Sequence, residues 1–252
     1  GLTPEAAEQL VGKAVAPAMP LVALGVQAVL RAPSDAWAQR GLGNLYDQAV
    51  DRVLPTIPAE VDESIWPRNM ANFQKQYPAV TDPEVLAYVQ GVADRLAKAG
   101  GQAKFKVFVC DVPWADAFNA GGHAMMIFTG LLRDMQDEAE LAAVMGHEMG
   151  HGMKRHMLGS AVGRHAAAAA VKRSAELNQP SDDEMQLVSS YVASLEPGQQ
   201  HDVDFVLAHV QDKVGAETLA HLRLIYNGEF ARLDAHRGQE AESDLIGARL
   251  NA

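Results

Sequence analysis

The chain has 252 residues, 48% of them hydrophobic and 21% charged, a composition that excludes a disordered or fibrous protein and allows a sizeable core. Its 21 basic and 32 acidic residues give a net charge of −11, and no Lys/Arg block offsets it, so we expect no nucleic-acid partner, because phosphate binding needs a positive patch. The single cysteine, Cys110, excludes an intrachain disulfide and a cysteine-rich metal site, which leaves histidine and carboxylate side chains to hold any metal.

The first hundred residues are predicted to be helical, with prolines marking the breaks. Ala14 to Leu30 is the most apolar stretch, but it has 17 residues and contains Pro17, Pro20 and Gly25, whereas a membrane span needs about 20 apolar residues. We expect a buried or interfacial helical segment here, and a membrane-contacting segment is the alternative. The chain begins with Gly rather than Met, which suggests a processed N-terminus and a removed segment that targeted the protein or contacted a membrane.

The period of the hydrophobic pattern changes twice after residue 80. A helix is predicted to begin at Asp82, which can cap it, and to end at Gly100-Gly101. Alternation then predicts a strand around 105–109. A loop that contains Asn119 leads to a second predicted strand from His123 to Thr129, which contains the apolar residues 125–128. From Asp137 to about Met157 the helical period returns.

Helices are predicted for the rest of the chain, including one with a capping start at Ser181. The expected fold is therefore α+β and mostly α-helical, with a small sheet packed against the helix that follows it. We expect one domain overall, made of four regions: an N-terminal helical region 1–101, the sheet and its helix 102–160, a helical insert 161–237, and a final helix 238–252.

A metal-binding motif lies within the helix that follows the sheet, where the sequence reads His147-Glu148-Met149-Gly150-His151. Residues four apart share a helix face, so both imidazoles can bind one zinc ion, and Glu148 would lie beside a zinc-bound water as a general base. Glycines at 146, 150 and 152 weaken this helix by about 1 kcal/mol each, which predicts close approach of another backbone or a substrate. The alternative is two surface histidines on a weak helix.

A third zinc ligand is expected downstream, because catalytic zinc takes three protein ligands and keeps one position open. The best candidate is Glu240, and Asp244, one turn later, can accept a hydrogen bond from the second nitrogen of a ligand histidine. Glu242 would point away from the metal. The alternative is an ordinary solvated acidic face.

These residues resemble a known peptidase family. His147 to His151 followed by Arg155-His156, and Glu240-x-x-x-Asp244 downstream, are similar to the zinc metallopeptidases that include the CAAX prenyl endoprotease, the heat-shock protease HtpX and the Oma-like periplasmic peptidases. Residues around 105–156 and 238–250 carry the resemblance.

The resemblance implies a gluzincin fold with one zinc per chain, held by His147, His151 and Glu240, with Glu148 as general base and Asp244 behind a ligand histidine. It also implies an edge strand at about 123–129 that binds an extended peptide by strand addition. The expected substrate-binding residues are Asn119, Met125, Met126, Ile127 and Phe128.

The expected function is zinc-dependent hydrolysis of peptide bonds in protein substrates, in the bacterial cell envelope or periplasm by resemblance. Two observations keep an alternative open, a proteolytically silent zinc-bound adaptor or chaperone: the long insert, and His123, which is either a surface histidine or a fourth, inhibitory histidine near zinc. A helical scaffold without metal is a third hypothesis. His156 is expected to pack or hydrogen-bond rather than bind metal.

Overall fold

The computed structural model describes residues 2–31, 35–200 and 202–251, which are mostly helical and include one three-stranded sheet. The predicted α+β, mostly α-helical fold is confirmed. The elements are α1 (Pro4–Val15), η1 (Ala16–Ala18), α2 (Met19–Leu30), α3 (Asp35–Val53), η2 (Leu54–Thr56), α4 (Ala59–Gln74), α5 (Pro83–Ala99), β1 (Lys106–Cys110), β2 (Ala117–Gly121), β3 (Ala124–Phe128), α6 (Thr129–Asp134), α7 (Glu138–Met153), α8 (His156–Asn178), α9 (Asp182–Ala193), α10 (Pro197–Gln200), α11 (Val203–Val210) and α12 (Ala216–Leu250).

The chain forms two compact units. The sheet unit consists of Gly1–Val11, Ile57–Ala161 and Arg237–Ala252, and the helical unit consists of Gly12–Thr56 and Val162–His236. The sheet unit contains all three strands, the whole of α7, and the end of α12 that carries Glu240 and Asp244.

The middle strand of the sheet is β3, since the strand order is β1-β3-β2, with β1 parallel and β2 antiparallel to it. The expectation that the strand at about 123–129 lies at an edge is therefore wrong, because β3 is paired on both sides. The loop expected around Asn119 is also wrong in part, because Ala117–Gly121 is the strand β2. Its small residues carry little strand propensity, and pairing with β3 makes it a strand.

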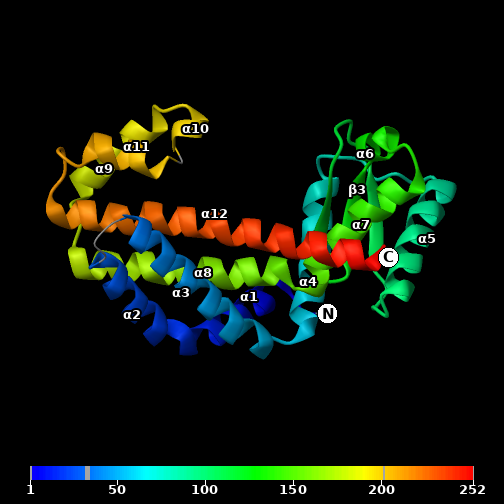
Figure 1. Ribbon diagram of the computed structural model, residues 1–252, viewed down its shortest axis with the longest axis horizontal. Helices are drawn as coiled ribbons and strands as arrows, with labels where there is room; N and C mark the ends of the chain where they lie inside the picture. Colours follow the sequence, from blue (N-terminus) through cyan, green and yellow to red (C-terminus); the bar gives the residue numbers. More distant parts are fainter. Residues whose placement is uncertain (1, 32–34, 201, 252) are drawn as a thin grey trace. The chain divides into compact units, whose positions relative to one another are not determined.

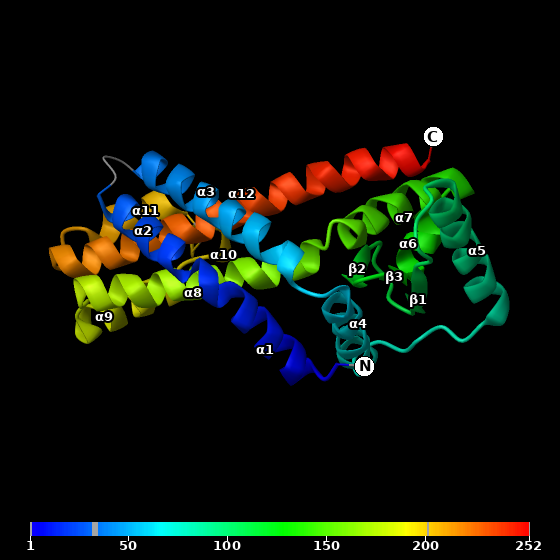
Figure 2. The same cartoon turned by 90° about the horizontal axis from the view of Figure 1, so that it is seen from below.

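Apolar helices cover both faces of β3, which explains its uninterrupted apolar sequence. Side chains alternate across a strand, so Met125 and Ile127 pack with α5 and α7, while Met126 and Phe128 pack on the opposite face with residues of α4. Figure 2 shows the strands with α5 and α7 along one side and α4 along the other.

Side-chain caps begin α5 and α7, the two helices on one face of the sheet. Asp82 accepts hydrogen bonds from the amides of Glu84 and Val85 at the start of α5, as predicted. Asp137 caps α7 by accepting from the amides of Ala139 and Glu140. Both caps satisfy amides that the first turn of a helix leaves without partners.

The expected continuous helix to about Met157 is interrupted at Arg155, which has a φ of 58° and separates α7 from α8. The Arg155 side chain holds this left-handed turn, because Nε donates to Oδ2 of Asp62 at 2.7 Å and Nη2 donates to the carbonyl of Ile57 at 2.8 Å. Asp62 is buried. A bulky residue in this conformation is costly, and the bonds to α4 and the chain before it offset that cost.

Two hydrophobic clusters hold the helical unit together. In one, residues of α2, α3, α8 and α12 pack against each other, and Figure 1 shows these helices alongside one another. In the other, α9 and α11 pack on the first turns of α12. Ser181 caps α9 as predicted, by accepting from the amide of Glu184.

The apolar N-terminal segment is helical, as predicted, and buries one side. Its buried residues recur every three or four positions: Val15, Ala18, Val22 and Val26. Leu24 lies on the other side and is 67% exposed. Among the described residues, the stretch Glu5–Gln27 is long and apolar enough to cross a membrane, and 28% of its window is buried.

Candidate metal centre

Glycines allow α7 and the end of α12 to lie unusually close together. A Cβ atom added to Gly150 would be 2.9 Å from Cα of Ser243, and one added to Gly247 would be 2.8 Å from the backbone nitrogen of His147. Gly152 is equally enclosed, because its added Cβ would lie 2.6 Å from the carbonyl oxygen of Gly122. A Cβ added to Gly146 would lie 3.1 Å from Cα of Gly247. The prediction that glycines 146, 150 and 152 permit another backbone to approach is therefore confirmed.

This close approach places three donor atoms around one point. Nε2 of His147 lies 3.1 Å from Nε2 of His151 and 3.2 Å from Oε2 of Glu240, and the third side of the triangle, from His151 to Glu240, is 3.5 Å. Among the described residues, these three form a cluster of histidine and carboxylate side chains that could hold a metal ion. The two histidines come from one face of α7, and the carboxylate comes from α12.

The triangle has the size that zinc requires. Four ligands about 2.0–2.1 Å from a zinc ion form a tetrahedron with edges of about 3.4 Å, and the three measured sides are close to that length. Two imidazoles and one carboxylate are also a known donor set for catalytic zinc, with the fourth position left for water or substrate. The residues present therefore fit a zinc ion.

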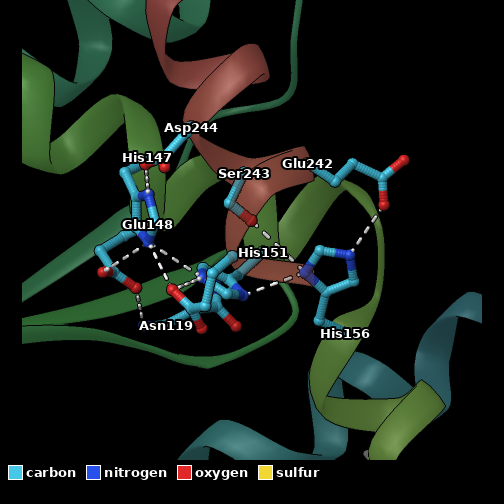
Figure 3. A network of polar contacts seen from close by, with 9 residues as sticks. Asn119, His147, Glu148, His151, His156, Glu242, Ser243 and Asp244 are labelled. Atoms are coloured by element: carbon cyan, nitrogen blue, oxygen red, sulfur yellow. Dashed lines mark hydrogen bonds and ion pairs between the residues drawn. The ribbon is translucent and has the colours of Figure 1, made fainter. Parts of the chain in front are cut away.

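Each of the two histidines has a hydrogen-bonding partner behind it, on the nitrogen that faces away from the triangle. Nδ1 of His147 lies 2.8 Å from Oδ1 of Asp244, and Nδ1 of His151 lies 3.0 Å from Nδ1 of His156. Nε2 of His156 lies 3.0 Å from Oε2 of Glu242. Figure 3 shows this network running from Asp244 through His147, His151 and His156 to Glu242.

Glu148 is buried beside the donor triangle. Its Oε2 accepts a hydrogen bond of 2.6 Å from the backbone amide of Asn119 in β2, while Oε1 lies 3.9 Å from Nε2 of His147. The first contact anchors the carboxylate to the sheet, and the second directs its other oxygen to the donors. Figure 3 shows Glu148 between His147 and Asn119.

Burial raises the pKa of Glu148 and lowers the pKa of His151, and both shifts suit metal binding and proton transfer. Desolvation raises the pKa of Glu148 to about 7, against smaller lowering effects of the His147 charge and the Asn119 amide. Desolvation lowers the pKa of His151 to about 4, so its ring is neutral at neutral pH. A neutral imidazole is the form that binds metal, and a carboxyl group with a pKa near 7 can both accept and return a proton.

The side chains expected to bind substrate are all buried. Met125, Met126, Ile127 and Phe128 are almost completely buried in the central strand, so their side chains cannot line a cleft. The side chain of Asn119 is also buried, where it bonds to the backbone of residues 121, 122 and 124.

Three further polar residues near the sheet unit's helices and strands have hydrogen-bonding or ion-pair partners, and only the bonding of His156 was expected from the sequence. His156 is a buried hydrogen-bonding residue, as expected, and Glu242, expected to point away, bonds to His156 and to Lys154. His123 lies in the turn between β2 and β3 and pairs with Glu63 at 2.6 Å, apart from the donor triangle. The adjacent Arg155-His156 pair was the sequence signal available for the network behind His151.

Relatives of this chain carry protease names. The mitochondrial metalloendopeptidase OMA1 of Arabidopsis thaliana is 40% identical over 53 residues, or 21% of this chain and 11% of the relative. A protease HtpX homolog of Caldanaerobacter subterraneus subsp. tengcongensis is 35% identical over 80 residues, or 31% and 27% of the two chains. The beta-barrel assembly-enhancing protease of Escherichia coli (strain K12) is 29% identical over 82 residues, or 32% and 17%.

The match to each relative is therefore local. It covers between 11% and 27% of the lengths of these three proteins. The family match is longer. The model of Peptidase family M48 matches residues 80–252, which contain the sheet, α7, the donor triangle and the polar network behind it. This match covers more than two thirds of the chain and confirms the resemblance found in the sequence. The chain belongs to Peptidase family M48.

Proposed function

We propose that this chain is a zinc-dependent endopeptidase that hydrolyses peptide bonds in protein substrates, with one zinc ion per chain. The observation that carries the proposal is the triangle of donor atoms from His147, His151 and Glu240, with sides close to those of a zinc tetrahedron, beside the buried carboxylate of Glu148. Membership of a peptidase family supports it.

His147, His151 and Glu240 would hold the metal, and Asp244 would orient the ring of His147. Zinc in such a site supplies Lewis acidity, which lowers the pKa of water from about 16 to about 7 and polarises a carbonyl group. Glu148 then accepts the proton of the attacking water on Oε1 and passes it to the leaving amine. The Asn119 amide keeps the other oxygen of Glu148 in place during both transfers.

We propose that substrate binds along β2 rather than β3. β2 is an edge strand of the sheet, and the amide of Asn119 points outward from it to Glu148, so this edge faces the reacting groups. An extended peptide that paired with the half-buried start of this edge, at Ala117 and Phe118, would place a carbonyl group near the donor triangle. Asn119 would contribute its backbone to the site, since its side chain bonds within the turn.

The test combines zinc content with cleavage of an unfolded casein substrate by the parent chain and the Glu148→Gln variant. Glu138→Gln is the matched control, because it makes the same change on an exposed position of the same helix. One zinc per chain in all three, with cleavage lost only in Glu148→Gln, is the expected result. Equal cleavage by Glu148→Gln would exclude it as the base.

Two other outcomes correspond to the alternative functions. Zinc in every protein without cleavage in any would favour a zinc-bound adaptor that holds clients without cutting them. No stoichiometric zinc would favour a helical scaffold without metal, and the donor triangle would then have another role.

We also propose a location in the bacterial cell envelope, with membrane contact through the apolar stretch between Glu5 and Gln27. The exposed Leu24 lies on this stretch, and flotation with phospholipid vesicles tests the contact. Leu24→Asp is expected to weaken flotation several-fold, whereas Leu187→Asp, at an exposed position on α9, should leave it unchanged. Equal flotation of the two variants would contradict the membrane contact.

A further inference from the structure

We propose that His156 and Glu242 form a hydrogen-bonded pair that fixes the tautomer and ring orientation of His151. The proposal rests on the zinc site proposed above, and it makes both residues positioning residues for a metal ligand. The contacts that carry it are the 3.0 Å approach of the two Nδ1 atoms of His151 and His156, and the 3.0 Å contact of His156 Nε2 with Oε2 of Glu242.

The direction of these bonds follows from the groups at their ends. A carboxylate can only accept, so Nε2 of His156 carries a proton and donates it to Glu242. Nδ1 of the neutral His156 ring is then an acceptor, and the proton between the two rings must belong to Nδ1 of His151. The lone pair of His151 is left on Nε2, the atom that points into the donor triangle.

The end of α12 supplies a partner to each ligand histidine by a different route. Asp244 bonds directly to His147, whereas Glu242 reaches His151 through His156. Glu242 lies two residues from Glu240 and is therefore on another side of the helix, which is why it meets His156 and not the donor triangle. Lys154 pairs with the other oxygen of Glu242 and holds that carboxylate in place.

The break between α7 and α8 brings His156 behind His151. In an unbroken helix a residue five positions later would face away from His151, but the left-handed turn at Arg155 redirects the chain. Asp62 and the carbonyl of Ile57 hold that turn, and His156 is only 7% exposed, so its ring is fixed where its Nδ1 meets His151. The turn therefore has a defined consequence for the metal ligand.

Two substitutions of similar size and polarity separate the two bonds of His156. In His156→Asn the amide oxygen takes the place of Nδ1, so it keeps the bond to His151 and loses the one to Glu242. In His156→Gln the amide group takes the place of Nε2, so it loses the bond to His151. Outer partners of ligand histidines typically contribute about 10- to 100-fold to metal affinity. We expect zinc affinity, measured by chelator competition, to fall about 10-fold or more in His156→Gln and less than about 3-fold in His156→Asn.

A second variant and a spectroscopic readout keep the test independent of folding and of activity. Glu242→Ala changes a half-exposed side chain and is expected to weaken zinc binding several-fold. Nitrogen-15 NMR of the imidazoles, in the metal-free protein, is expected to show His151 protonated on Nδ1 in the parent and in His156→Asn, but not in His156→Gln.

Equal zinc affinity and an unchanged His151 tautomer in His156→Gln would overturn the proposal. If the parent shows the expected tautomer but binds no zinc, the hydrogen-bonded pair stands and the zinc peptidase function fails. If the protein binds zinc but the His151 tautomer is the same in the parent and in the residue 156 variants, the zinc peptidase function stands and the positioning role of His156 and Glu242 is excluded.

Discussion

Replacing Gly150 with alanine tests whether the contact between α7 and α12 builds the donor triangle. The added Cβ would lie 2.9 Å from Cα and 3.0 Å from the carbonyl oxygen of Ser243. Favourable carbon contacts are about 3.5–4.0 Å, so the helices must move apart by about 0.5–1 Å. Overpacking costs about 1–3 kcal/mol and alanine returns about 1 kcal/mol of helix propensity, which gives a net loss of up to about 2 kcal/mol.

The effect on zinc should be larger than the effect on stability. Ser243 lies three residues from Glu240 on the same helix, and metal ligands must keep their distances within about 0.2 Å, so the separation of the helices pulls the carboxylate from the triangle. We expect zinc affinity in chelator competition to fall at least about 10-fold. Gly238→Ala is the control, because Gly238 lies on the same helix as Glu240 and a Cβ added there would have no neighbouring atom within 4 Å.

Gly238→Ala should gain up to about 1 kcal/mol in denaturant unfolding and bind zinc as the parent does. If Gly150→Ala gains stability to the same extent and keeps its zinc affinity, the close packing of the helices is not what positions Glu240.

Three further predictions concern the same site. Because burial raises the pKa of Glu148 to about 7, its charge destabilises the metal-free fold fully above that pH and not at all below about 4.5. Glu148→Gln should therefore stabilise the metal-free protein by roughly 2–3 kcal/mol at pH 8 and by under about 1 kcal/mol at pH 5 in urea unfolding, and a pH-independent difference would contradict this. Asp244→Ala should lower zinc affinity about 10- to 100-fold in chelator competition without lowering the melting temperature of the metal-free protein. Unchanged zinc affinity would refute the proposal that Asp244 orients the ring of His147. Zinc at about 1,000 times its dissociation constant should add about 4 kcal/mol of stability that a chelator removes, and an unmoved thermal transition would mean that the folded chain binds no zinc.

The parts of the site that sequence could predict depend on local geometry. Asp82 caps α5 through amides two and three residues away, and His147 and His151 share a face because they are four residues apart. Glu240 was a candidate because Asp244 follows it by one turn. Helical spacing therefore predicted which side chains could act together, before any contact between distant segments was known.

The parts that could not be predicted depend on contacts between distant segments. The turn at Arg155 contains no glycine or proline, and its side-chain bond to Asp62 joins residues 93 positions apart. β2 has little strand propensity of its own and forms by pairing with β3. The central position of β3 did have a local signal, since Ala124–Phe128 is uninterrupted apolar sequence, which is typical of a strand covered on both faces.

The order of the proposed zinc ligands along the chain has a consequence for synthesis. Glu240 follows His147 by 93 residues, and chains grow at about 5–20 residues per second. A nascent chain thus carries the histidine pair and Glu148 for about 5–20 s before the third ligand has been made. During that interval the donor triangle is incomplete, so the ribosome-bound chain cannot assemble the proposed zinc centre. The 93-residue separation of His147 and Glu240 would therefore delay the proposed hydrolytic activity until α12 has been made.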